Sequence, residues 1–112
     1  MNITVSIIDA VSGHPAEGVE VSVVGQPAGE LTGHLNGLTD PAGNFTYSSG
    51  AAQVSWSGQY ILELNVDAYF ASQGMMAGYK SVTIVVRVDS TRSNYRIGTF
   101  ITPFAHATWS VR

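Results

Sequence analysis

Residues Ile3–Pro27, which read ITVSIIDAVSGHPAEGVEVSVVGQP, decide the fold class because they hold two strand patterns separated by turn-forming residues. The first pattern, Ile3–Ile8, is rich in Val and Ile, and Ser12–Pro15 then breaks it. In the second pattern, Val alternates with polar residues along Val19–Val23, and Gly25–Pro27 ends it. Alternation with a period of two residues is typical of a strand with one buried face. The stretch therefore predicts two short strands joined by a turn.

The rest of the chain repeats this succession of apolar runs and turn residues. Thr39–Asn44 predicts a tight connection between antiparallel strands, and the small, polar stretch Gly50–Gln53 predicts a loop. Pro103 separates the last two strands. After the first two, strands are predicted in Leu31–Leu38, Phe45–Tyr47, Tyr60–Leu64, Val82–Val88, Tyr95–Thr102 and Ala105–Val111.

A single short helix is predicted between the strand patterns. Asp67 is a candidate N-cap, Ala68–Gln73 is long enough for about two turns, and Gly74 suits the end of a helix. Seven or eight short strands with one short helix predict an all-β fold, specifically a two-sheet antiparallel sandwich.

The composition predicts that other subunits cover part of the surface. The chain has 112 residues, which is enough for one domain spanning residues 1–112 and too few for two. Hydrophobic residues make up 45% of it and charged residues only 12%, which is little charge to cover a monomer of this size.

The charge balance argues against nucleic acid and membranes as partners. Lys and Arg together number 5 and the net charge is -3, so the chain offers no basic patch for a phosphate backbone. No apolar run approaches the length of a membrane span. The chain has no cysteine and no phosphate-binding loop, so neither a metal nor a cofactor is predicted. The N-terminus lacks the pattern of a signal peptide, and a cytoplasmic protein is expected.

Four stretches together resemble the family that contains transthyretin and 5-hydroxyisourate hydrolase. Ile7–Val19 resembles the family's opening, a strand ending in Leu-Asp that leads into Gly-x-Pro-Ala-x-x-Val. Gly37–Gly43 resembles its Gly-x-Thr-x-x-x-Gly turn, and Gly58–Gly74 resembles its strand followed by a short helix. Tyr95–Phe104 falls where the family has a Tyr-x-Ile/Val strand and a Ser-Pro-Tyr turn. The resemblance covers nearly the whole chain and implies a transthyretin-like, or prealbumin-like, sandwich.

The resemblance also implies a homotetramer. In the family, pairs of sandwiches share strands, and two such dimers enclose a channel that holds the ligand sites. The residues agree with this expectation, because a low charge fraction and an apolar C-terminal strand indicate a sheet edge that a partner chain covers.

The positions that carry the hydrolase's chemistry are altered in this chain. The hydrolase has a His, an Arg and a second His where this chain has Ser6, Asn44 and Arg96, and it ends in Tyr-Arg-Gly-Ser where this chain has Trp109–Arg112. Ring opening of hydroxyisourate needs a group that accepts a proton from water near neutral pH. A serine hydroxyl is a poor base and a guanidinium stays protonated, so ordinary 5-hydroxyisourate hydrolysis is not expected.

The same resemblance implies a different site around the channel. Arg96 would pair with a carboxylate, enolate or phenolate, Trp109 and Phe100 would stack on a flat ring, and the small residue Gly98 would leave room for that ring beside Arg96. The alternative is that Arg96 lies on a solvated face and Trp109 fills a dimer contact. The residues assigned to catalysis are Arg96, Ser6 and Asn44, and those assigned to substrate binding are Ile8, Gly98, Phe100, Ala107, Trp109 and Val111.

Three functions stay open at this point. The first is a small-molecule enzyme with altered chemistry, which promotes ring closure, ring opening or decarboxylation of a planar substrate that can be anionic. The second is a ligand carrier without catalysis, as transthyretin is. The third is a residual 5-hydroxyisourate hydrolase of purine catabolism. The histidines do not decide between them, because His14 falls in a turn and His106 is predicted on the strand face opposite Trp109, as a hydrogen-bonded core residue.

Overall fold

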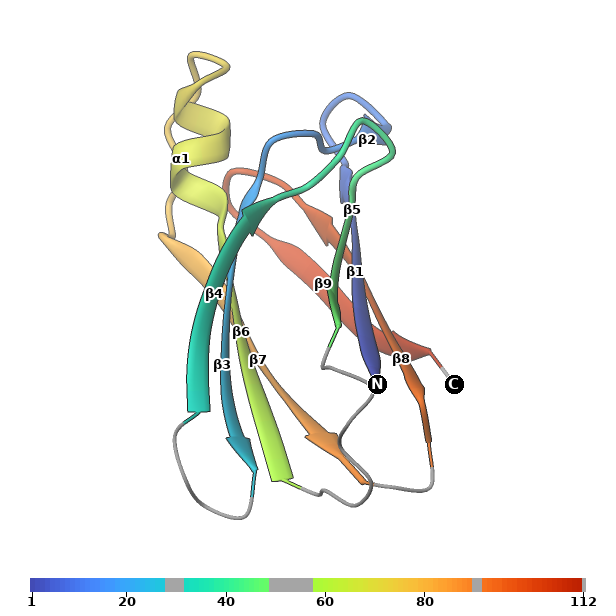
Figure 1. The fold of residues 1–112 in the computed structure, drawn as a ribbon. Coiled ribbons are helices and arrows are strands. Elements are labelled where there is room, and N and C mark those ends of the chain that lie inside the picture. Colours follow the sequence, from blue (N-terminus) through green and yellow to red (C-terminus); the bar gives the residue numbers. More distant parts are fainter. Residues whose placement is uncertain (28–31, 49–57, 90–91, 112) are drawn as a thin grey trace.

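Two β-sheets face each other, with one short helix at one end (Figure 1). The computed structural model describes residues 1–27, 32–48, 58–89 and 92–111. One sheet has the order β4-β3-β6-β7, with β3 Glu20–Pro27, β4 Thr32–Leu38, β6 Gly58–Asn65 and β7 Ser81–Val88. The other has the order β2-β1-β8-β9, with β5 also paired to β1; its strands are β1 Asn2–Asp9, β2 His14–Pro15, β5 Asn44–Ser48, β8 Asn94–Ile101 and β9 His106–Val111. The predicted all-β sandwich with one short helix is confirmed.

One pairing is parallel, whereas the other pairings of the described strands are antiparallel. Strands β1 and β8 run side by side in the same direction over their whole length, from Asn2 opposite Asn94 to Asp9 opposite Ile101. Most of the chain lies between these two strands, so no hairpin forces them to be antiparallel. The strand from the N-terminal end of the chain thus lies at the centre of its sheet.

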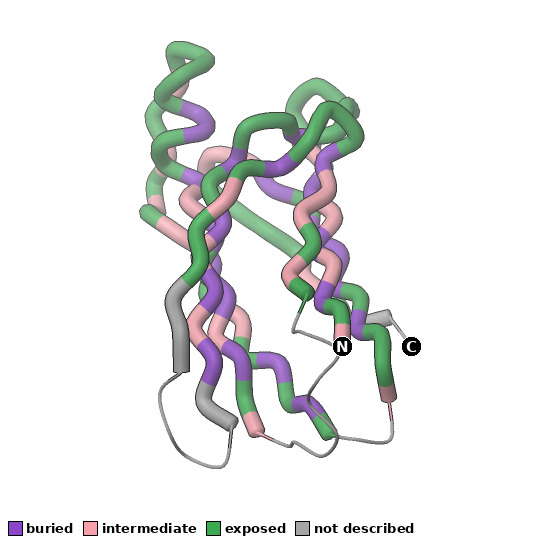
Figure 2. Tube along the Cα trace, in the orientation of Figure 1, coloured by how far each residue is buried: buried purple, intermediate pink, exposed green. Residues whose placement is uncertain are grey.

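The core lies between the sheets and follows the alternation seen in the sequence. Along β1 the side chains of Ile3, Val5 and Ile7 are buried, while the residues between them are partly exposed. Figure 2 shows buried residues alternating with more exposed ones in other strands too, as along β6. Because successive side chains of a strand point to opposite faces, each sheet keeps an outer face free of core residues.

Helix α1 spans Val66–Ala71 and begins two residues before the predicted start. Its N-cap is Asn65 and not Asp67, because the Asn65 side chain accepts a hydrogen bond from the backbone N–H of Ala68 at 3.1 Å. Asp67 instead lies in the first turn, where a carboxylate interacts favourably with the helix dipole. Gly74 follows the helix in the left-handed conformation, with φ 77°. The predicted loop Gly50–Gln53 lies outside the described residues.

A buried carboxylate connects the helix to the end of β1. Asp9 is 1% exposed, and its Oδ1 accepts hydrogen bonds from the backbone N–H groups of Val11 and Ser12, at 2.9 and 3.3 Å. Its Oδ2 accepts a hydrogen bond from the hydroxyl of Tyr69 on α1 at 2.8 Å. Burial, with a contribution from this hydrogen bond, raises the pKa of Tyr69 to about 12. Asp9 therefore holds both the turn after β1 and the helix.

Replacing Tyr69 with Phe should lower the free energy of unfolding at pH 7 by roughly 1–3 kcal/mol, because the buried Asp9 carboxylate loses a partner. The raised pKa adds a pH dependence. The folded protein favours the neutral phenol. The stabilisation that the Tyr69 hydroxyl provides is therefore complete below about pH 10 and is lost as the pH rises toward 12. Urea unfolding at pH 7 and pH 11 measures both effects. If wild type and variant differ in free energy of unfolding as much at pH 11 as at pH 7, the role assigned to the Tyr69 hydroxyl is wrong.

Candidate functional site

The outer face of the five-stranded sheet gathers side chains from four strands into rows. The register of β1, β5, β8 and β9 fixes these rows, since residues paired across neighbouring strands point to the same face. One row contains Thr46, Thr4, Arg96 and Val111, the next contains Asn44, Ser6, Gly98 and Trp109, and a third contains Ile8, Phe100 and Ala107.

All nine residues predicted for the site fall in these rows, Val111 through its backbone pairing with Arg96. The structure adds two residues that sequence reasoning missed, Thr4 and Thr46, whose hydroxyls lie 3.0 Å apart. The sequence could have indicated both, because Thr4 is two residues from Ser6 and Thr46 is two residues from Asn44. Residues two apart on a strand point to the same face.

The polar side of the face is built around Asn44. The Ser6 hydroxyl donates to Asn44 Oδ1 at 2.6 Å. The turn before β5 sets this position, because Asp40 Oδ1 accepts the backbone N–H of Asn44 at 2.9 Å. Gly43 is left-handed, with φ 79°, and a Cβ there would collide with the backbone oxygen of Ile7. A glycine is therefore required beside Asn44.

The aromatic side of the face is formed by Phe100 and Trp109. Their ring centroids lie 4.9 Å apart with an interplanar angle of 57°, which is a favourable aromatic pair. The indole of Trp109 also lies over Gly98, since a Cβ at 98 would be 2.5 Å from its Cε2 and Cζ2 atoms. The room beside Gly98 that was predicted for a ligand ring is thus filled by Trp109 itself. A ligand must stack on the indole and not beneath it.

The turn between β8 and β9 holds this aromatic side in register. Thr102 Oγ1 accepts the backbone N–H of Ala105 at 2.9 Å, and the Thr102 N–H donates to the Ala105 oxygen at 2.9 Å. The Tyr79 hydroxyl lies 2.9 Å from the backbone oxygens of both residues. These contacts close the hairpin so that Trp109 stands opposite Gly98.

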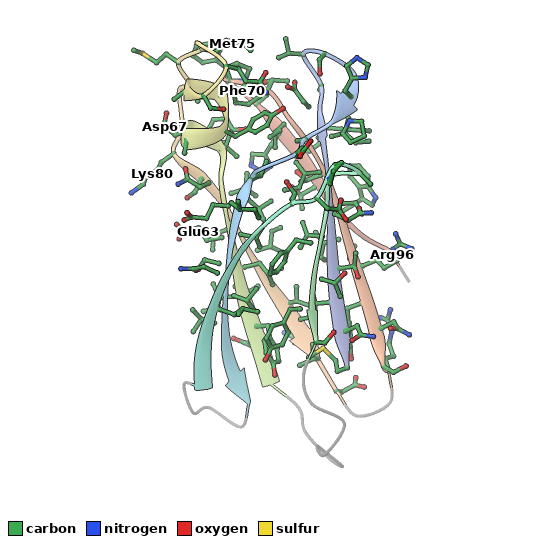
Figure 3. The ribbon with its side chains drawn as sticks, turned by 45° about the horizontal axis from the view of Figure 1, so that its top comes forward. Glu63, Asp67, Phe70, Met75, Lys80 and Arg96 are labelled. Atoms are coloured by element: carbon green, nitrogen blue, oxygen red, sulfur yellow. The ribbon has the colours of Figure 1, made fainter. Side chains whose placement is uncertain are left out.

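Arg96 is the cation of the outer face. It lies on β8 next to Thr4 of β1, it is exposed, and Figure 3 shows its side chain directed away from the sandwich. No hydrogen bond or ion pair joins its guanidinium to any residue that the structure describes. Since no described residue pairs with it, the Arg96 guanidinium is a candidate contact for an anionic ligand.

The rows contain no side chain that could act as a general base near neutral pH. Asp, Glu and His are absent from them. His14 is exposed in the β2 hairpin. His106 was predicted to be a core residue, but it is exposed at the sheet edge, where Nδ1 lies 3.2 Å from the Thr108 hydroxyl and the ring packs against Tyr79. Chemistry on this face would have to rely on charge and orientation.

Two other properties bear on the kind of site. In residues 1–27, 32–48, 58–89 and 92–111, no three His, Cys, Asp or Glu side chains gather into a group that could hold a metal ion. Within the same residues, no helix is long and apolar enough to cross a membrane.

The sequence model of the HIUase/Transthyretin family matches residues 3–110. The chain belongs to this family. Transthyretin from Sparus aurata is 27% identical over 97% of this chain and 95% of its own, with a TM-score of 0.83. Sea bream transthyretin in complex with thyroxine is 28% identical over 97% of this chain and 93% of its own, with a TM-score of 0.81. The 5-hydroxyisourate hydrolase of Klebsiella pneumoniae is 25% identical over 99% of this chain and 98% of its own, with a TM-score of 0.78.

Membership of the HIUase/Transthyretin family supports either a hydrolase-like or a transthyretin-like role. The similarity to the two kinds of protein is close to equal, with identities of 25% and 27%. Overall likeness therefore does not separate the two roles, and the side chains of the outer face must do so.

Replacing Gly98 with Ala should displace the Trp109 indole and destabilise this family member by about 1–3 kcal/mol, as in other overpacked sites. The matched control is the same change in a Trp109→Ala background, where the obstructing ring is gone. There the change at 98 should cost less than about 0.5 kcal/mol, so the two substitutions are strongly coupled. Urea unfolding of the four proteins measures the coupling. Equal costs in both backgrounds would show that the indole does not cover Gly98.

Proposed function

We propose that the outer face of the five-stranded sheet binds a planar small molecule with an acidic or anionic group and promotes its ring closure, ring opening or decarboxylation. The observation that supports this most is the position of Arg96, which has no partner among the described residues, in the row next to Trp109. Arg96 would stabilise negative charge that develops on the substrate, while Trp109 and Phe100 hold its ring. Ser6 and Asn44 would orient it by hydrogen bonds.

The absence of a general base from the rows limits the chemistry. A substrate that carries its own acidic proton can lose it without a strong base, and a fixed cation then lowers the energy of the resulting enolate or carboxylate. The same absence supports a second candidate, a carrier that binds such a molecule without transforming it. A carrier needs only the aromatic pair and Arg96.

We also propose that the site is completed by other copies of the chain in a homotetramer. Phe100 is 42% and Trp109 40% exposed in the single chain, so the aromatic pair lacks a cover. Strand β7 pairs only with β6, and β9 only with β8, among the described strands. A crevice of about 370 Å³, lined by residues such as Val85 and Ser110, separates these two edges. Sheet edges that no described strand covers favour strand pairing with a second copy.

Light scattering at micromolar concentration should give a mass close to four times the 11.9 kDa of one chain. The physical reason is the exposed aromatic pair and the two free sheet edges, which association would bury. A stable monomer at this concentration would contradict the proposed assembly.

The purified protein should not appreciably accelerate the decay of 5-hydroxyisourate, followed by its absorbance. Neither Ser6 nor Arg96 can take a proton from water near pH 7, and the rows offer no other base. The 5-hydroxyisourate hydrolase of Klebsiella pneumoniae is a suitable positive control. A comparable rate for the two proteins would overturn the proposed loss of this activity.

Arg96→Met should weaken the binding of 2-naphthoate, a planar aromatic carboxylate, by about ten- to a hundredfold. Methionine keeps much of the side-chain length and removes the charge, so a charge-assisted contact worth roughly 1.5–3 kcal/mol is lost. Isothermal titration calorimetry measures the affinity. Lys80→Met is the control for removing a surface cation, because Lys80 is exposed at the α1 end of the molecule. Equal affinities for wild type and Arg96→Met would place Arg96 on a solvated face outside the site.

A further inference from the structure

The outer face presents hydrogen-bond donors that have no partner among the described residues, and these donors specify the ligand beyond its charge. We infer that Asn44 and Trp109 select, together with Arg96, a planar ligand that turns acceptors toward these three side chains, such as a conjugated carboxylate or an enolate flanked by carbonyl groups. This inference rests on the proposed function, since it assumes that the outer face is the site.

Asn44 has its carbonyl side engaged and its amino side free. The Ser6 hydroxyl donates to Asn44 Oδ1 at 2.6 Å, so this oxygen already has a partner. The backbone N–H of Asn44 is held by Asp40 at 2.9 Å, which fixes the residue at the start of β5. In the described part of the chain, no acceptor pairs with Asn44 Nδ2. Asn44 therefore offers the ligand the N–H donors of Nδ2, while one lone pair of its Oδ1 is taken by Ser6.

Trp109 offers a second donor at the other end of the same row. Its Nε1 lies directly above Gly98, where a Cβ would be only 2.7 Å away. The indole is fixed from one side by Phe100 and from below by the sheet. Within the described residues, Nε1–H has no hydrogen-bond partner. An indole is a donor only, so this position also requires an acceptor on the ligand.

The hydroxyl groups near these donors are joined to neighbouring side chains, although each hydroxyl oxygen keeps a lone pair that can accept. Thr4 and Thr46 bond to each other at 3.0 Å, and Ser6 bonds to Asn44. The rows contain no carboxylate or imidazole that could accept a hydrogen bond from a ligand. A ligand that turns N–H groups toward Asn44 Nδ2 and Trp109 Nε1 would leave these protein donors unpaired, which is costly once water is excluded.

The register also sets the size of the ligand. Asn44 and Gly98 are separated by two strand spacings, or about 10 Å. Arg96 lies two residues from Gly98 along β8, or about 7 Å. A ring system of one or two fused rings can span the first distance over Ser6. An acidic group on its side then reaches the row of Arg96.

Three molecules of the same shape test the inference, namely 2-naphthoate, 2-naphthamide and 2-naphthamidine. The first presents acceptors only, the second one acceptor and one donor, and the third donors only. Calorimetric affinities at pH 7 should fall in that order, with naphthoate at least about tenfold tighter than naphthamidine. Trp109→Phe, which keeps a ring and removes the donor, should weaken naphthoate by about two- to tenfold. Asn44→Asp, which replaces the donor by an acceptor of the same shape, should weaken it by about tenfold or more.

Asn36→Asp is the control for the added charge, because Asn36 is exposed on β4 of the other sheet, and it should leave all three affinities unchanged. Thermal unfolding checks that each variant folds. If naphthoate binds and depends on Arg96, but Trp109→Phe and Asn44→Asp bind it as wild type does, the donor assignment is wrong and the proposed function stands. Equal affinity for naphthoate and naphthamidine also overturns the inference. If naphthoate does not bind at about 1 mM, the proposed function falls with it.

Discussion

The parallel pairing of β1 with β8 is the constraint on which the rest of the site depends. It sets Thr4 beside Arg96, Ser6 beside Gly98 and Ile8 beside Phe100. Strand β5 adds Asn44 on one side and β9 adds Trp109 on the other. A shift of one residue in this pairing would turn the same side chains into the core, where Arg96 could not be solvated. The apolar residues on the other face of β1 thus fix the polar site as firmly as they fix the core.

The site differs in kind from one built for acid–base catalysis. In the rows, the donors include one permanent cation, and the side-chain acceptors are hydroxyl and amide oxygens, which are poor bases. Such a face stabilises negative charge but cannot move a proton by itself. This is the physical reason for our proposal that the chain, a member of the HIUase/Transthyretin family, promotes other chemistry or carries a ligand instead of hydrolysing 5-hydroxyisourate.

Much of this arrangement could be predicted from the sequence, because a strand alternates with a strict period of two. That period placed Arg96, Gly98 and Phe100 on one face, and the strand boundaries followed from Gly, Pro and polar turns. It could not reveal the parallel pairing of β1 with β8, which joins segments far apart in the chain and has no local signal. The position of the Trp109 ring over Gly98 was also hidden, since side-chain direction depends on the neighbouring strand. The helix start was missed because Asn65 and Asp67 are both good N-caps, and burial of Val66 favours the earlier one.

The central claim, that the outer face of the five-stranded sheet is the ligand site, is tested most directly by an NMR titration with 2-naphthoate. We expect four signals to shift together with one saturation curve. They are the indole N–H of Trp109, the side-chain amide of Asn44 and the backbone signals of Ser6 and Gly98. Signals of Glu63 and Thr83, which share the outer face of the other sheet, should stay in place. Saturable shifts confined to that other face, or to the crevice beside Val85 and Ser110, would contradict the account.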